Sequence, residues 1–172
     1  MTDILIQVVN DHDEPTHGAT KEELWRQNLP HRIVKIVIED ETGRILLQRR
    51  SPNKIPFPDN WDVSVAGHVD EGEDYEQAAL RELSEELGIM DATLTVLGDY
   101  RSHSMYEWRR LNRFNRVYKG QINSLTPLVP EVGDIAEVRW VTLAELQNLI
   151  KNDPDHVTNG LRETIERYYS PL

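Results

Sequence analysis

The sequence predicts a mixed α/β fold in a single domain. Apolar segments with the length or alternation of β-strands follow one another along the chain, separated by segments that carry helix start signals. Three of these signals are capping boxes, in which an N-cap residue is followed three residues later by Glu or Gln: Thr20 with Glu23, Asp74 with Gln77, and Thr142 with Glu145. With 172 residues, the chain is long enough for one domain with its own core and not comfortably for two.

The first 30 residues are expected to form a strand and a helix. Residues 4–9 predict a short strand that ends in the turn-forming residues 10–13. Thr20 then opens a brief helix that ends before Pro30. We therefore expect residues 1–172 to form one domain, with residues 1–30 as an extension packed on its core.

A hairpin and a third strand come next. The hairpin is predicted over residues 32–39 and 44–48, and residues 61–66 alternate like a strand. Between them, residues 51–60 hold three prolines and predict an ordered loop, which contains Lys54.

Two arginines stand at the end of the hairpin's second strand. Arg49 and Arg50 could bind a phosphate there, because a guanidinium group matches phosphate geometry. Unpaired surface arginines explain them equally well.

The central helix is predicted over residues 75–87. Asp74 is a good N-cap, the segment contains no Gly or Pro, and Gly88 is the expected stop. At about 100° per residue, one arc of roughly 100° holds three carboxylates, from Glu82, Glu85 and Glu86. The neighbouring apolar stripe, which would pack on the core, consists of Leu80, Leu83 and Leu87.

Carboxylates grouped on a rigid helix beside the core suit a hard divalent cation. Mg²⁺ and Mn²⁺ prefer oxygen ligands and keep waters for a phosphate substrate. Residues 81–87 alone would also fit an ordinary amphipathic helix, with Arg81 and Glu85 as an i,i+4 ion pair.

The second half of the chain predicts further strands and two helices. Strands are expected over residues 92–97, 108–121 and 137–141, a connection over 100–107, and helices from Thr142 and over 160–169. One face of the long strand carries Arg109, Arg113 and Asn115, which could clamp phosphates. A charged solvent face is the simpler account of these residues.

Composition limits the classes of partner and the compartment. The net charge of −11 argues against a general nucleic-acid surface, because nucleic acids favour clustered Lys and Arg. The absence of cysteine excludes disulfides, thiolate metal sites and cysteine nucleophiles. The first residues show neither a signal peptide nor a membrane span, so we expect a cytoplasmic protein without membrane contact.

Residues 67–89 carry a longer pattern, G-x5-E-x7-R-E-U-x-E-E-x-G-U, in which U is a bulky aliphatic residue. The matching residues are Gly67, Glu73, Arg81, Glu82, Leu83, Glu85, Glu86, Gly88 and Ile89. The pattern resembles the Nudix box at every position. The resemblance implies an α/β/α sandwich around a mixed sheet, and a divalent-metal-dependent diphosphate hydrolase.

The resemblance also implies roles for individual residues. Glu82, Glu85 and Glu86 would hold Mg²⁺ or Mn²⁺, with a backbone carbonyl near Gly67. Arg81 and Glu73 would hold the glutamates and the loop in place. An acidic residue before the last strand serves some members as a further ligand or a general base, and the candidates here are Asp134, Glu137 and Glu131.

The likeness extends to the isopentenyl-diphosphate isomerases and to bacterial Nudix hydrolases that share their layout. Residues 31–32, 46–58 and 61–68 carry it. The isomerases use an active-site cysteine, and Ala66 stands at that position. His31 and His68 match two of their metal histidines, but the strand over residues 108–121 supplies no acidic residue.

We therefore expect hydrolysis of a diphosphate linkage, in a nucleoside diphosphate-type substrate, by metal-activated water. Arg49, Arg50, Lys54 and His68 are the candidate substrate-binding residues. An isomerase, a non-catalytic nucleotide-sensing module and an RNA decapping enzyme are the alternatives. The expected partner is a small molecule, and a homodimer stays open.

Overall fold

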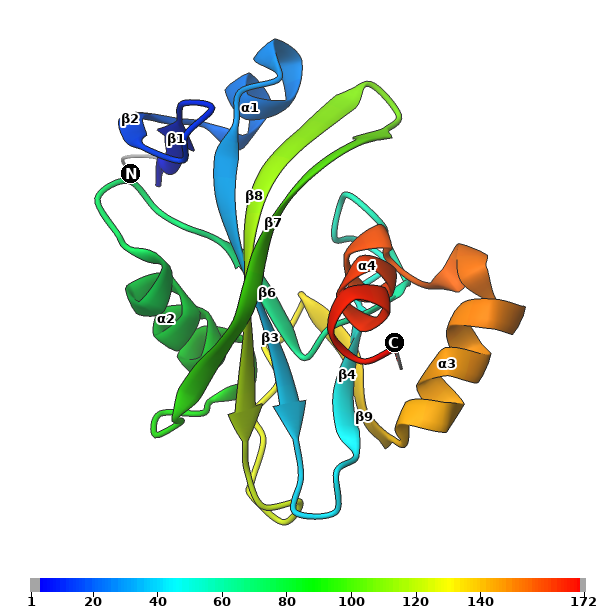
Figure 1. The fold of residues 1–172 in the computed structure, drawn as a ribbon. Coiled ribbons are helices and arrows are strands. Elements are labelled where there is room, and N and C mark those ends of the chain that lie inside the picture. The colour runs from blue at the N-terminus through cyan, green and yellow to red at the C-terminus, as the bar shows by residue number, and fades with distance from the viewer. Residues whose placement is uncertain (1–3, 171–172) are drawn as a thin grey trace.

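The computed structural model describes residues 4–170, which form a nine-stranded mixed sheet with helices on both faces (Figure 1). Along the chain the elements are β1 (Ile6–Val9), β2 (Pro15–Ala19), α1 (Lys21–Gln27), β3 (His31–Glu39), β4 (Ile45–Arg50), β5 (Trp61–Asp62), β6 (Val65–His68), α2 (Tyr75–Leu87), β7 (Leu94–Tyr106), β8 (Arg109–Gln121), β9 (Ile135–Val141), α3 (Leu143–Asn152), the 3₁₀ turn Pro154–His156 and α4 (Asn159–Tyr168). The predicted α/β/α arrangement around a mixed sheet is confirmed.

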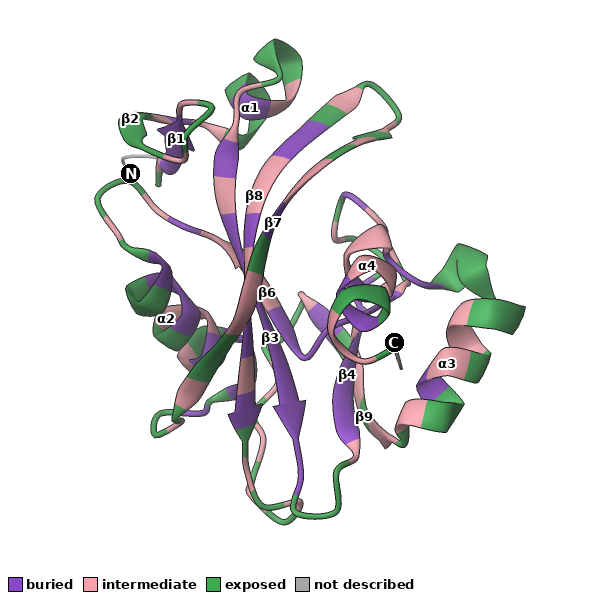
Figure 2. Cartoon of the chain, viewed as in Figure 1, coloured by how far each residue is buried: buried purple, intermediate pink, exposed green. Residues whose placement is uncertain are grey.

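Strand β3 is the centre of the sheet and is buried along nearly its whole length (Figure 2). On one side it pairs in parallel with β8, from His31 opposite Arg113 to Glu39 opposite Gln121. On its other side it meets β1, β6 and β4 in succession, all antiparallel. The sheet therefore divides beyond β3, because β6 and β4 follow separate paths.

Two hydrophobic cores lie on the two faces of the sheet. Helix α2 covers one face, where Leu83 and Leu87 are fully buried against Val34 and Ile36. Helices α3 and α4 cover the other, where Leu146 and Leu161 pack beside Val117. Because successive side chains of a strand point to opposite faces, β3 supplies both cores.

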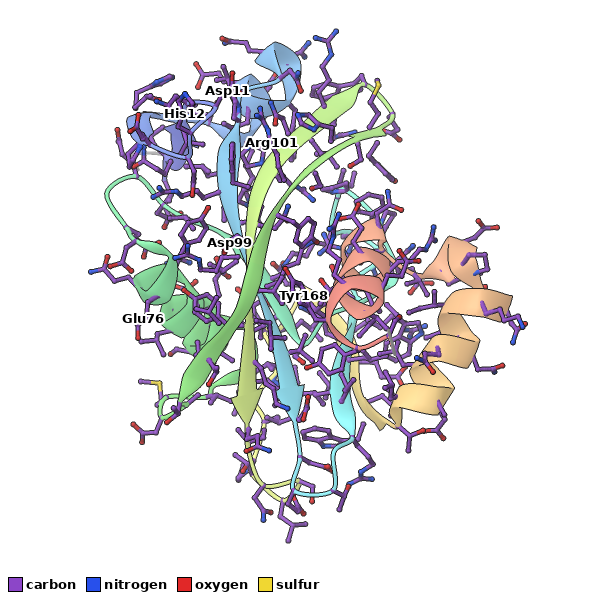
Figure 3. All side chains as sticks on the ribbon, in the orientation of Figure 1. Asp11, His12, Glu76, Asp99, Arg101 and Tyr168 are labelled. Atoms are coloured by element: carbon purple, nitrogen blue, oxygen red, sulfur yellow. The ribbon has the colours of Figure 1, made fainter. Side chains whose placement is uncertain are left out.

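The N-terminal residues are joined to the sheet. The amide of Val9 donates to the carbonyl of Pro30 at 2.9 Å, and Leu24 of α1 is fully buried in a small cluster with β1. Asp11, in the turn after β1, forms an ion pair of 2.9 Å with Arg101 of β7 (Figure 3). This contact ties the N-terminal unit to the long β7–β8 hairpin.

Three expectations for single elements were wrong. The strand expected over residues 92–97 runs on to Tyr106, so the connection expected over 100–107 is mostly strand. The strand expected over residues 61–66 is split into β5 and β6. Leu80 is 41% exposed, and the core side of α2 is formed instead by Ala78, Ala79, Leu83 and Leu87.

None of the helices in residues 4–170 is long and apolar enough to cross a membrane.

Candidate functional site

A cavity of about 300 Å³ opens where the sheet divides between β6 and β4. Helix α2 contributes Arg81, Glu82, Glu85 and Glu86 to its wall. The helix is placed by local signals: Asp74 and Gln77 cap each other's backbone amides, and Gly88 ends the helix with a left-handed φ of 70°. The predicted bounds of this helix are confirmed.

Glu86 is the most buried of the carboxylates, with 3% exposure. It accepts hydrogen bonds from Gln48 Nε2 at 2.9 Å, Lys54 Nζ at 3.2 Å and the amide of Ala66 at 3.4 Å. Burial raises its pKa, and these donors offset only part of that effect. A second positive charge nearby would therefore stabilise its ionised form.

Glu82 lies directly against the backbone of β6. An added Cβ on Gly67 would be 1.9 Å from Glu82 Cδ, so only a glycine admits this carboxylate. Burial and the neighbouring Glu86 raise the pKa of Glu82 to about 7, although Arg81 acts in the opposite direction.

Arg81 connects the helix to the loop that precedes it. Its guanidinium donates two hydrogen bonds of 2.9 Å to Glu73 and one of 2.9 Å to the carbonyl of His68. It also contacts Glu82 at 2.8 Å and Glu85 at 3.1 Å. One side chain therefore fixes the loop and orients two of the three glutamates.

Lys54 reaches the glutamates from the loop between β4 and β5. Its Nζ lies 3.2 Å from Glu86 and 2.6 Å from Asp134, in the segment before β9. Burial opposes the charge of Lys54, but Glu86 and Asp134 raise its pKa above the usual value.

The donor set fits a hard divalent cation. All the candidate ligand atoms are oxygens, and two carboxylates with raised pKa values lie close together with little solvent. Within residues 4–170, no three such side chains already converge on a point where an ion could sit. As the structure stands, Arg81 holds Glu82 and Glu85, and Lys54 holds Glu86. A bound cation would have to replace some of these contacts.

The structure separates the other candidate residues into two groups. Arg50, Lys54, His68, Glu131 and Asp134 line the cavity. Arg49 and Glu137 lie outside it, 3.6 Å apart, and Glu137 also pairs with Arg139 at 2.7 Å.

His68 and His31 stack with their ring centroids 5.4 Å apart. The Nε2 atoms of both rings are buried and have no hydrogen-bond partner among the described residues. Burial, aided by the charge of Arg113, lowers the pKa of His31 to about 3, and burial lowers that of His68 well below its usual value. Both rings are therefore neutral at physiological pH.

Several residues of the cavity wall had not been predicted. Lys35 is the main one, and Lys21, Trp25 and Asp62 also line the cavity. Lys35 did leave a signal, since it is a charged residue in the middle of an otherwise apolar strand.

The chain is similar to known proteins over most of its length. The family model described as NUDIX domain matches residues 29–161. The chain is 30% identical over 166 residues to isopentenyl-diphosphate Delta-isomerase 2 of Photorhabdus laumondii, covering 96% of this chain and 92% of the relative. It is 29% identical over 169 residues to the prenyl-diphosphate phosphatase of Methanosarcina mazei, covering 96% and 95%.

Among solved structures, DR0079 from Deinococcus radiodurans superposes with a TM-score of 0.79 at 27% identity. The match covers 96% of this chain and 99% of that one.

Proposed function

The chain belongs to the Nudix family, and we propose that it hydrolyses a diphosphate linkage in a small-molecule substrate of the nucleoside diphosphate type, with Mg²⁺ or Mn²⁺ as cofactor. The observation that carries the proposal is the neighbouring pair of the half-buried Glu82 and the buried Glu86, held between two cations, Arg81 and Lys54, at the wall of a cavity. Clustered carboxylates of this kind have little use in stability alone, because burying like charges is costly.

The proposed roles follow from the contacts. Glu82, Glu85 and Glu86 hold the cation, together with a backbone oxygen near Gly67. Arg81 and Glu73 hold α2 and the loop before it in a fixed relative position. When bound, the cation polarises the diphosphate oxygens and makes water more acidic.

The cavity residues would then act on the substrate itself. Lys54 offers its ammonium group to the phosphate oxygens, and Arg50 and His68 lie in the same wall. Asp134 is the better candidate for the general base: it lines the cavity, as Glu131 also does and Glu137 does not, and it contacts Lys54 at 2.6 Å beside Glu86. The proton of the attacking water would pass to this carboxylate as the water oxygen bonds to phosphorus, while the bridging phosphorus–oxygen bond breaks and the other phosphate-bearing fragment leaves with its electron pair.

An isomerase remains the principal alternative, given the likeness to isopentenyl-diphosphate isomerases. That reaction adds a proton to one carbon and removes one from another, so it needs acid and base groups on both sides of the substrate. Ala66 carries no proton to give, and β8 contains no Asp or Glu. These two residue choices favour hydrolysis.

The test is a substrate panel of nucleoside diphosphates and triphosphates, sugar nucleotides, dinucleotides and prenyl diphosphates, with Mg²⁺ or Mn²⁺. We expect release of phosphate or a phosphorylated product from at least one class, and no isomer from isopentenyl diphosphate. Catalytic isomer formation that disappears in Glu86→Gln would overturn the proposal, as would a folded protein that cleaves no member of the panel.

A further inference from the structure

The wall of the cavity opposite the glutamates is built from β3, β8 and the start of α4. In the parallel register His31 is opposite Arg113 and Lys35 opposite Val117, so Lys35 and Arg113 lie on the same face of the sheet. Thr158, the N-cap of α4, and Gly160, in the first turn of this helix, complete this surface, and all four residues line the cavity. Lys35, Arg113, Thr158 and Gly160 are called the inner wall below.

Lys35 is buried with few partners. Lys35 is 4% exposed, and its Nζ donates a hydrogen bond to Tyr100 Oη at 2.6 Å. Within residues 4–170 this is its single hydrogen bond, and no carboxylate lies within ion-pair distance. An ammonium group has three donors, so two of them are left for something in the cavity.

The start of α4 makes the position of Lys35 less favourable still. An added Cβ on Gly160, the second residue of the helix, would lie 2.9 Å from Lys35 Nζ. The N-terminus of a helix carries partial positive charge from its free amides, and it favours anions and disfavours cations. A lysine ammonium beside this end of α4 therefore leaves positive charge uncompensated.

Arg113 adds a second cation. Its Nε is buried without a hydrogen-bond partner, and its guanidinium forms no ion pair among the described residues. Two carboxylates, Asp62 and Glu163, favour the charge of both Lys35 and Arg113, but neither forms an ion pair with them among the described residues. Asp62 already accepts from Thr158 at 2.8 Å and lies 3.5 Å from Arg50. Positive charge exceeds negative charge here, although the whole chain carries a net charge of −11.

We propose that the inner wall binds an anionic group of the substrate, a phosphate or a carboxylate, that lies beyond the diphosphate. This inference rests on the proposed function and narrows its substrate class to diphosphates whose X group is itself charged, in place of a hydrocarbon chain. An anion would supply the missing partners of Lys35 and Arg113 and would also meet the amides of α4.

Ala66 connects the two parts of the cavity. Its amide donates to Glu86, and its side chain shares the sheet face of Lys35, which it pairs with across β3 and β6. Ala66 lines the same cavity as the glutamates and the inner wall, so one substrate in this cavity can contact both.

The experiment uses short alkyl diphosphates that differ only at the far end, which is a methyl, a hydroxyl, a carboxylate or a phosphate. For the wild type we expect kcat/KM to be about tenfold or more higher with an anionic end than with a methyl end, chiefly through KM. The carboxylate and phosphate members show which anion is preferred. Lys35→Met and Arg113→Met should remove this preference, so that kcat/KM becomes similar for the anionic and the methyl-ended members. Lys151→Met, at an exposed lysine of α3, is the matched control and should behave as the wild type.

A wild type without preference for an anionic end, or variants that keep the preference, would overturn the proposal. If the wild type cleaves no member of the series, the proposed hydrolysis of such diphosphates is wrong. Anion binding by the inner wall is then tested separately, by measuring the melting temperature in EDTA with and without inorganic phosphate. Stabilisation of the wild type that is lost in Lys35→Met would support it, and equal stabilisation of both would overturn it. Should Lys35→Met not fold, Arg113→Met and Gly160→Ala serve in its place. In Gly160→Ala, the added methyl group would displace the Lys35 ammonium group.

Discussion

Glu82 occupies the space in which a side chain on Gly67 would have to lie. An added Cβ there would be 1.9 Å from Glu82 Cδ and 2.0 Å from Oε1. Gly67 does not have a positive φ. Its lack of a side chain instead allows the Glu82 carboxylate to lie against the backbone of β6.

Gly67→Ala should therefore displace the Glu82 carboxyl group. We expect a loss of about 1–3 kcal/mol in the free energy of unfolding, as for other overpacked sites, together with lower activity. Urea unfolding and steady-state kinetics measure the two effects. Shortening the carboxylate in Gly67→Ala/Glu82→Asp should restore stability more than activity. Unchanged stability of Gly67→Ala would show that the Glu82 carboxyl group moves away from position 67 at little cost in free energy.

Glu86→Gln should lower kcat by roughly a hundredfold to ten-thousandfold, because an anionic ligand of the cation is lost. The fold should persist, since a neutral amide at this buried position removes a costly charge, its oxygen can accept from Lys54, and the Gln48 amide can rotate to accept from the new NH₂ group. Glu76→Gln is the control, at an exposed position on the first turn of the same helix (Figure 3). Turnover near that of the wild type in a folded Glu86→Gln protein would contradict the assignment of Glu86.

Divalent cations should raise the melting temperature. The loop and helix around the site gather Asp70, Glu73, Glu82, Glu85 and Glu86, and Arg81 compensates only part of their charge. A ligand at a hundredfold excess over Kd stabilises by about 2.7 kcal/mol, which corresponds to roughly 5–10 °C for a chain of this size. Melts in EDTA and in millimolar Mg²⁺ or Mn²⁺ provide the measurement, and coincident melts would argue against a cation site.

Asp40 should contribute a part of the stability that depends on pH. Its burial disfavours the charge, but hydrogen bonds from Thr42 and Arg44 outweigh burial and lower its pKa from 3.8 to about 2. A depressed carboxyl pKa stabilises the fold above the unfolded-state value, and that stabilisation is lost as the pH falls from about 4 to 2.

Asp40→Asn should thus be less stable than the wild type at pH 7, and the difference should shrink near pH 2.5. Urea unfolding at both pH values tests this, with Asp91→Asn at an exposed position as control. A difference that stays constant with pH would assign the effect to packing.

Local signals explain which parts of the fold could be predicted. The bounds of α2 follow from Asp74, Gln77 and Gly88, which act within a few residues of one another. The length of β7 does not, because its second half is held by pairing with β8, for example Ser102 with Arg113. A strand maintained by a partner need not show a strand pattern of its own.

The candidate site divides in the same way. The spacing of the glutamates is a property of one helix and could be read directly. Whether Arg49 or Arg50 faces the cavity depends on a register shift between β4 and β9, which no local pattern encodes. Lys35 and Arg113 are 78 positions apart in the chain, and only the β3–β8 register brings them to one surface.

That register also has a consequence for the order in which the molecule folds. The pairs of β3 with β6 and of β7 with β8 close short loops, whereas parallel pairing of β3 with β8 closes a loop of about 80 residues and costs more chain entropy. We expect the region of the glutamates to assemble early, and the surface that carries Lys35 and Arg113 to form when the β7–β8 hairpin docks. Val117→Ala, at a fully buried position of β8, should then mainly accelerate unfolding and leave the refolding rate little changed. A variant that slowed refolding instead would place this docking in the folding nucleus.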